Sequence, residues 1–150
     1  MTRQDHAMTS GLPPSDLATR KPRPVLPDGW PQPRGYANGM IAQGKVLTTG
    51  GLVGWNENGV FARDFLGQVG QTLANIRAVV EAGGGEVSDI MRLTWYVTDI
   101  EAYRGCLAEL GPVYRAHLGR HFPAMAVVAV SALVEPEAMV EIEATAVLAD

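Results

Sequence analysis

The spacing of apolar residues changes twice between residues 61 and 97, and this change restricts the fold strongly. A helical spacing of three and four residues comes first and predicts an amphipathic helix, carried by Phe65, Val69, Thr72, Leu73, Ile76 and Val80. Gly83-Gly84-Gly85 predicts its end, because glycine takes the left-handed conformation of a helix C-terminus without penalty. The next stretch, IMRLTWYV at 90–97, alternates apolar and polar residues and predicts a half-buried strand.

Further strand and helix patterns lie before residue 61 and after residue 97. Two short strands, 39–42 and 45–49, are separated by Gln43-Gly44, which predicts a hairpin. A second helix is expected to start near Asp99 and to bend or split at Pro112, with one face formed by Tyr103, Leu107, Leu110, Tyr114 and Leu118. Strands are expected at 124–130 and 139–148. The order is therefore ββαβαββ, an α+β fold.

Prolines are concentrated before this domain. Seven of the ten fall before residue 34, so that stretch is expected to hold neither a regular helix nor an interior strand. We interpret 1–34 as an extended or mobile arm and 35–150 as one domain. Trp30 is large and apolar, and is a candidate for fixing the end of the arm to the domain.

Composition excludes several classes of function. The chain has 150 residues, of which 47% are hydrophobic, and a net charge of −4, so nothing suggests binding to nucleic acid or to an anionic membrane. No apolar run approaches the ~20 residues of a membrane span. The N-terminal stretch lacks the apolar segment of a secretory signal, and the single Cys106 excludes an internal disulfide, so a cytoplasmic protein is expected.

Isolated residues give weak signals for chemistry. His117 and His121 have metal-ligand spacing, but no third ligand matches and Gly119 is expected to end the helix between them, so we expect no metal. Cys106 is interpreted as a small hydrophobic residue rather than a nucleophile. Gly50-Gly51 follows a strand and either forms a bulge or tight turn or offers N–H groups to a developing oxyanion.

Two carboxylates are more informative. Glu141 and Glu143 share one face of a strand whose other face is apolar, and such a strand is expected to be central. Carboxylates in that position need partners or a wet cleft, unless the face is simply open to solvent. The pattern leaves both interpretations open.

Several motifs, taken together, resemble one known family. In order they are GYANGMIAQGKVLTTGGL, LANIRAVVEAGG, YVTDIEAY, YRAHLGRHFPAM and VEIEATAV, and they extend from about residue 35 to 147. They resemble the Rid family (reactive intermediate deaminase, YjgF, also called endoribonuclease L-PSP). This resemblance implies a chorismate-mutase-like fold with two helices packed on one face of the sheet, assembled as a homotrimer with clefts between subunits. It also implies hydrolysis of reactive enamines and imines to keto acids and ammonia, with no cofactor.

The resemblance also implies roles for particular residues. Carried over by motif, Glu141 positions water, and the substrate cleft is lined by Tyr36 and by the strand end formed by Thr49, Gly50 and Gly51. The family's deaminating branch has an arginine that holds the substrate carboxylate, in a PAR motif. This chain reads PAM, with Met125 at that position, and it lacks the asparagine usual in the second helix.

Methionine in place of arginine changes the expected substrate. A carboxylate buried against Met125 would lose its charge partner, at a cost on the order of 3 to 5 kcal/mol. We therefore expect hydrolysis of a neutral or less anionic imine, with a non-catalytic trimer that binds a small molecule as the alternative. Arg92 or Arg120 is a candidate substitute for the missing arginine. RNA cleavage fits poorly with an acidic chain.

Overall fold

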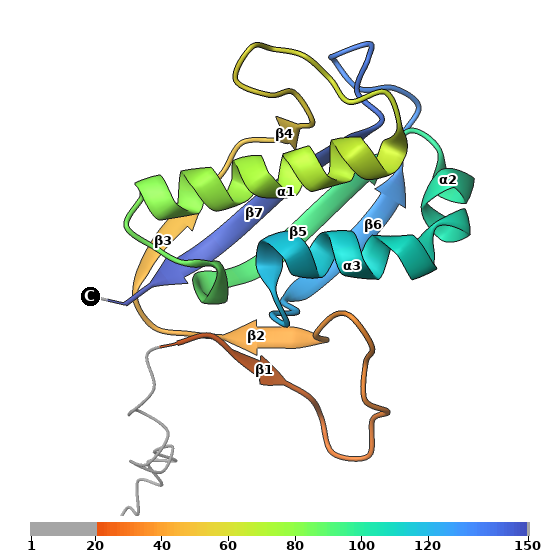
Figure 1. Cartoon of the computed structure of the whole chain (residues 1–150). Helices are drawn as coiled ribbons and strands as arrows, with labels where there is room; N and C mark the ends of the chain where they lie inside the picture. Colours follow the sequence, from red (N-terminus) through yellow and green to blue (C-terminus); the bar gives the residue numbers. More distant parts are fainter. Residues whose placement is uncertain (1–20, 150) are drawn as a thin grey trace, which may run out of the picture.

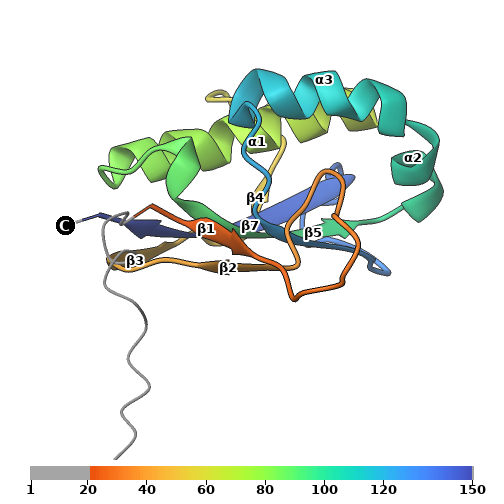
Figure 2. The same ribbon diagram turned by 90° about the horizontal axis from the view of Figure 1, so that it is seen from below.

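The computed structural model describes residues 21–149, which form a mixed sheet with helices on one side (Figures 1 and 2). The strand order is β3 (Lys45–Thr48), β7 (Val140–Leu148), β5 (Ile90–Val97) and β6 (Ala124–Ala129), and β4 (Leu52–Val53) also pairs with β7. In this sheet β5 and β6 are parallel, whereas β7 is antiparallel to β3, β4 and β5. The long central strand β7 therefore contacts three others, as its apolar face predicts.

Three helices cover one face of this sheet: α1 (Phe65–Ala82), α2 (Ile100–Gly105) and α3 (Leu107–Leu118). A short 3-10 helix, η2 (Val87–Asp89), leads into β5. The core lies between the helices and the sheet, and its largest fully buried apolar side chains are Trp95, Leu73, Ile76, Ile90, Leu93, Leu118, Ile142, Val69, Val80, Val97 and Val140. The predicted α+β fold with helices on one face is confirmed.

Helix α1 follows directly from local sequence. Asp64 caps it by accepting a hydrogen bond from the Gly67 N–H at 2.8 Å, which satisfies one of the free N–H groups of the first turn. Five of the six residues predicted for the contact face are buried, and Gln68 is buried as well. The helix ends at the glycine triplet, where Gly84 has a φ of +88°.

The second helical segment breaks in a different place from the predicted one. The break is at Cys106, between α2 and α3, and Pro112 lies inside α3. Pro112 and Ala108 are both exposed, so the Ala108 carbonyl that lacks a proline N–H can bond to water instead. Leu107, predicted to lie on the buried face, is 55% exposed because it follows the break.

The predicted hairpin between 39–42 and 45–49 is wrong. Strand β2 (Gly39–Ile41) pairs with β1 (Arg23–Val25) in a separate two-stranded ribbon, whereas β3 pairs with β7. At Gly44, φ is +153° and an added Cβ would lie 1.9 Å from the Leu148 carbonyl oxygen, so the chain passes closely over the end of β7 rather than reversing. Strand β3 gains a longer partner in this way.

The ribbon changes the picture of the N-terminal segment. Residues 23–25 pair with β2 at one end of the main sheet (Figure 1), so the chain is already part of the folded unit before the predicted start of the domain at residue 35. Pro24 is tolerated because the ribbon has only edge strands. The first 20 residues of the predicted arm lie outside the described residues.

Candidate active site

The sheet face opposite the helices carries the two predicted carboxylates. Glu141 and Glu143 are half-buried on this face because alternate residues of β7 are buried under the helices. Tyr96 on β5 is paired with Glu141 in register, and its hydroxyl donates to Glu143 Oε1 at 2.9 Å. This hydrogen bond from Tyr96 to Glu143 raises the pKa of the Tyr96 hydroxyl. Glu143 therefore has a side-chain partner.

Glu141 lies against the loop that joins β3 to β4. A Cβ added at Gly51 would lie 1.9 Å from Glu141 Oε1, whereas one added at Gly50 would meet nothing within 4 Å. Only a residue without a side chain lets the Glu141 carboxylate approach the backbone at position 51 so closely. Both glycines are exposed, so the carboxylate and the backbone beside it face solvent.

Thr49 fixes the start of this loop. Its N–H donates to the Ala144 carbonyl at 2.9 Å, and its hydroxyl accepts from the Ala144 N–H at 2.9 Å. The same hydroxyl donates to the Gly50 carbonyl at 2.7 Å. Thr49 thus bonds to both the carbonyl and the N–H of Ala144 on β7. These bonds hold Gly50 and Gly51 beside Glu141. The structure brings together four of the six predicted site residues: Thr49, Gly50, Gly51 and Glu141.

Met125 lies on the other side of the sheet. It is paired with Leu93, which is fully buried under the helices, and its side chain packs against the same core. Glu141 points away from the helices. In one protomer, Met125 and Glu141 therefore face opposite sides of the sheet and do not form a common cleft.

Tyr36 lies beside the start of β6, the strand that carries Met125, and not beside Glu141. The residue after it, Ala37, bridges to Ala124 at the start of β6, two strands away from β7. Tyr36 lines a pocket of about 570 Å³ together with Arg120. Arg92, the other candidate substitute for arginine, is exposed on β5, with its Nε 3.4 Å from the Thr94 hydroxyl.

The surroundings of His117, His121 and Cys106 fit structural rather than catalytic roles. His121 Nε2 donates to the Ile90 carbonyl at 2.6 Å, and burial lowers the pKa of His117, helped by the nearby charge of Arg77. Desolvation raises the pKa of the Cys106 thiol, which disfavours the nucleophilic thiolate. Among residues 21–149, no group of His, Cys, Asp and Glu side chains is arranged to hold a metal, and no helix there is long and apolar enough to span a membrane.

Comparison with known proteins identifies the family. A family model described as endoribonuclease L-PSP matches residues 31–148. The chain belongs to this family, the Rid family. It is 34% identical over 115 residues to a 2-iminobutanoate/2-iminopropanoate deaminase of Salmonella typhimurium, covering 75% of this chain and 86% of the relative. A RutC family protein of Pyrococcus horikoshii is 30% identical over 124 residues, covering 81% of this chain and 94% of that protein.

Solved structures of Rid proteins agree with the fold. The Yersinia pestis member of the conserved Rid family, described as a protein of unknown function, has a TM-score of 0.71 and 32% identity, and the match covers 85% of this chain and 99% of that one. The Escherichia coli YjgF protein has a TM-score of 0.60 and 34% identity, over 75% of this chain and 87% of that one. The predicted membership of the Rid family is confirmed.

Two features of this Rid protein were not found by sequence reasoning. The Tyr96–Glu143 hydrogen bond joins two residues whose faces were predicted correctly, but their pairing depends on the register between β5 and β7. The pocket that contains Tyr36 depends on prolines of the segment interpreted as an arm, and a proline-rich composition gives no signal for where such a segment packs.

Proposed function

We propose that this Rid protein hydrolyses the C=N bond of a small imine or enamine, releasing ammonia or an amine and a carbonyl compound. Glu141 acts as general base for the attacking water, and the N–H groups near Gly50 and Gly51 receive the negative charge that develops during attack. Thr49 positions these glycines. Two of the relatives support this chemistry, since the Salmonella typhimurium and Escherichia coli proteins are named as imine deaminases.

The observation that carries the proposal is the close approach of Glu141 to Gly51. A half-buried carboxylate beside exposed backbone is placed to bind water and to orient it. Glu143, two residues further on, accepts a hydrogen bond from Tyr96 and is less suited to this role. One positioned general base contributes roughly 10²- to 10⁴-fold to a rate.

The substrate of this proposal carries no carboxylate on the reacting carbon. Met125 takes the place of the arginine that the family resemblance assigns to carboxylate binding, and a thioether offers no charge and no paired N–H donors. Met125 also packs against the hydrophobic core, so an anion beside it would be poorly solvated. An imine with an uncharged substituent fits the surroundings of Met125 better.

The site of the proposal needs two protomers. Within one protomer Met125 and Glu141 lie on opposite faces of the sheet, and Tyr36 lies near the start of β6. We place the reaction in clefts between the subunits of a homotrimer, with Glu141 supplied by one protomer and with Met125 and Tyr36 completing the cleft across the interface. Sedimentation analysis tests the trimer, and a stable active monomer would contradict it.

The decisive experiment compares two matched substitutions. We expect Glu141→Gln to lower kcat/KM for ammonia release from uncharged imines by roughly 10²- to 10⁴-fold, because the amide has the same shape but accepts no proton. Glu143→Gln is the control, since it changes the neighbouring carboxylate of the same strand face. Equal rates for wild type and Glu141→Gln would remove Glu141 from the mechanism.

One observation favours a second candidate function, a non-catalytic trimer that binds a small molecule. Val128 is apolar and 44% exposed, and it is paired with Tyr96 on the sheet face opposite the helices, so apolar surface for a small molecule is available on that face. Thermal-shift screening with uncharged metabolites separates the two functions. Compounds that bind and are then consumed would reject the non-catalytic one.

A further inference from the structure

A pocket of about 580 Å³ lies where α1 and α3 end beside η2, in the helix layer of the molecule (Figure 1). Its lining comes from three segments that are far apart in the sequence: the last turns of α1, the residues at η2, and residues 115–121 of α3 and the turn after it. Tyr36, Met125 and Glu141 do not line it. Glu141 points away from the helices, so this pocket is separate from the C=N site proposed above.

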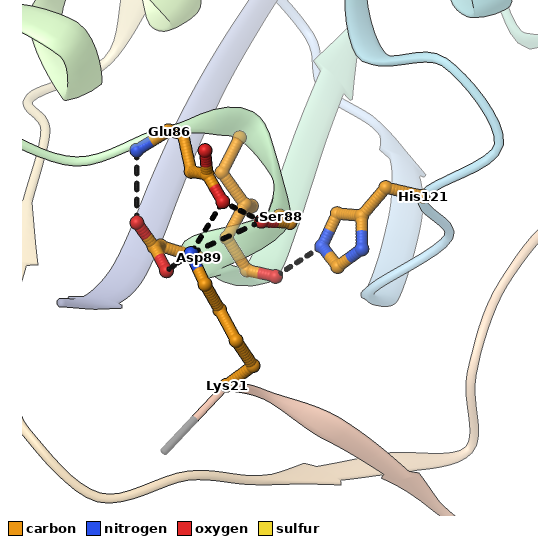
Figure 3. Close-up of polar contacts among 6 residues, drawn as sticks. Lys21, Glu86, Ser88, Asp89 and His121 are labelled. Atoms are coloured by element: carbon orange, nitrogen blue, oxygen red, sulfur yellow. Dashed lines mark hydrogen bonds and ion pairs between the residues drawn. The ribbon is translucent and has the colours of Figure 1, made fainter. Parts of the chain in front are cut away.

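The wall of the pocket at η2 is fixed by a cluster of ion pairs and hydrogen bonds. Lys21 donates to Asp89 Oδ1 at 2.8 Å and pairs with Glu86, whose carboxylate also accepts from the Ser88 hydroxyl at 2.7 Å (Figure 3). The bonds from Lys21 and Ser88 lower the pKa of Glu86. Beside this cluster, His121 Nε2 donates to the first carbonyl of β5 at 2.6 Å, which holds the turn after α3 in place. The cavity is therefore preformed, as ligand sites usually are.

The helix wall carries three arginines, and two of them have no carboxylate partner. Arg77 of α1 donates through Nε to Glu81 at 2.6 Å. Arg115 and Arg120 form no ion pair among residues 21–149, although the chain has a net charge of −4. The pKa of His117 is lowered by burial and then by the charge of Arg77, which places Arg77 near the α3 side of the pocket. The pocket thus presents guanidinium groups from both helices.

Helix-end electrostatics account for only part of this charge. Arg115 and His117 lie in the last turn of α3, where the carbonyl dipoles favour a cation. Arg120 lies beyond that helix, and Arg77 lies more than one turn before the end of α1, so helix capping explains neither. A guanidinium presents paired N–H donors in a planar fork that fits phosphate oxygens. The surplus arginines therefore favour a phosphate-bearing ligand.

The rest of the lining indicates the body of such a ligand. Apart from the imidazoles of His117 and His121, no aromatic side chain of the described part of the chain lines this pocket, so a nucleobase would find no stacking platform. The apolar lining is limited to Val87, Ala116 and Leu118. Hydroxyl, imidazole and carboxylate groups are all able to hydrogen-bond to the hydroxyl groups of a ligand. These features suit a polyhydroxylated body rather than an aromatic one.

We propose that this pocket binds a small phosphate monoester of a sugar or polyol, with the three arginines around the phosphate and with Ser88 and the two histidines beside the hydroxyl groups. A phosphate monoester carries a charge of about −1.5 to −2 near neutral pH, which more than one guanidinium can share. The volume of about 580 Å³ is in the usual range for small-molecule sites. This binding site stands or falls independently of the proposed hydrolysis, because it is tested by binding alone.

The test titrates glucose 6-phosphate against the full chain by calorimetry or NMR, with glucose as the uncharged match and inorganic phosphate as the anion without a sugar. We expect saturable binding of glucose 6-phosphate, with both other probes at least about 10-fold weaker, because each lacks one half of the recognised group. Arg115→Gln should weaken glucose 6-phosphate by about 10-fold and leave glucose unchanged. Arg115 is exposed, so this variant should fold normally, which its Tm checks.

The control is Arg63→Gln, since Arg63 is an exposed arginine that lines a different pocket and not this one. It should bind glucose 6-phosphate as wild type does. Equal losses in both variants would mean a general effect of surface charge and would overturn the proposal. Inorganic phosphate that binds as tightly as glucose 6-phosphate would leave a bare anion site and overturn it too. So would equal binding of glucose, or no saturable binding of glucose 6-phosphate up to about 10 mM.

Discussion

Replacing Gly51 by alanine tests whether the position of the Glu141 carboxylate matters for catalysis. The added Cβ would lie 1.9 Å from Oε1, 2.7 Å from Cδ and 2.9 Å from Cγ of Glu141. Ordinary contact between such atoms needs about 3.5 Å, so the carboxylate must move by more than about 1 Å. A displacement of that size costs on the order of 10²-fold in rate, and we expect kcat/KM for an uncharged imine to fall by about that factor.

The same substitution should affect stability little. Glu141 is half-buried at an open face, so its side chain can rotate away at a cost of about 0.5 to 1.5 kcal/mol. Gly51 has no positive φ, so alanine adds no backbone strain. Denaturant unfolding measures this cost, and Gly50→Ala is the comparator because its methyl group meets no neighbour within 4 Å.

A double-mutant cycle gives the refuting result. In a Glu141→Gln background, Gly51→Ala should add less than about a 3-fold further loss, because both changes remove the same positioned base. Full additivity of the two losses would mean that the Gly51 methyl group acts through something other than Glu141. Wild-type activity of Gly51→Ala would refute the role of that contact altogether.

Two further predictions concern stability. Gln68 is buried, and its side-chain amide donates to the Ala62 and Glu137 carbonyls and accepts from the Met139 N–H. Gln68→Leu should therefore lower the free energy of unfolding by about 3 kcal/mol, measured by urea titration, and a loss below about 1 kcal/mol would contradict this. Burial lowers the pKa of His117 in the folded state, so the unfolded chain binds its proton first and stability should fall as the pH drops below about 6.5. His117→Gln should flatten that part of the stability–pH curve, and an unchanged slope would contradict the assignment.

The sequence predicted the elements whose signals are local. The contact face of α1, the alternation of β5 and the carboxylate face of β7 each follow from period and capping, and the structure confirms them. Each of these patterns depends only on residues within one or two helical turns or along one strand.

Features that depend on pairing between distant segments were not predictable. Gln43-Gly44 has the composition of a turn, yet β3 pairs with β7, which lies about a hundred residues later in the sequence. Met125 and Glu141 were each assigned to a cleft, but only the sheet shows that they face opposite sides within one protomer. Pro112 carries a strong local penalty inside a helix, but it and Ala108 are exposed, so the Ala108 carbonyl that lacks a proline N–H can bond to water.

The most direct test of the proposed substrate is the ratio of kcat/KM for an uncharged imine to that for 2-iminopropanoate, measured for wild type and for Met125→Arg. We expect wild type to favour the uncharged imine, and Met125→Arg to raise kcat/KM for 2-iminopropanoate by on the order of 10²- to 10³-fold, with Met125→Leu as the control that leaves it low. A wild-type protein that already prefers 2-iminopropanoate, or an arginine variant that gains nothing for it, would contradict the account.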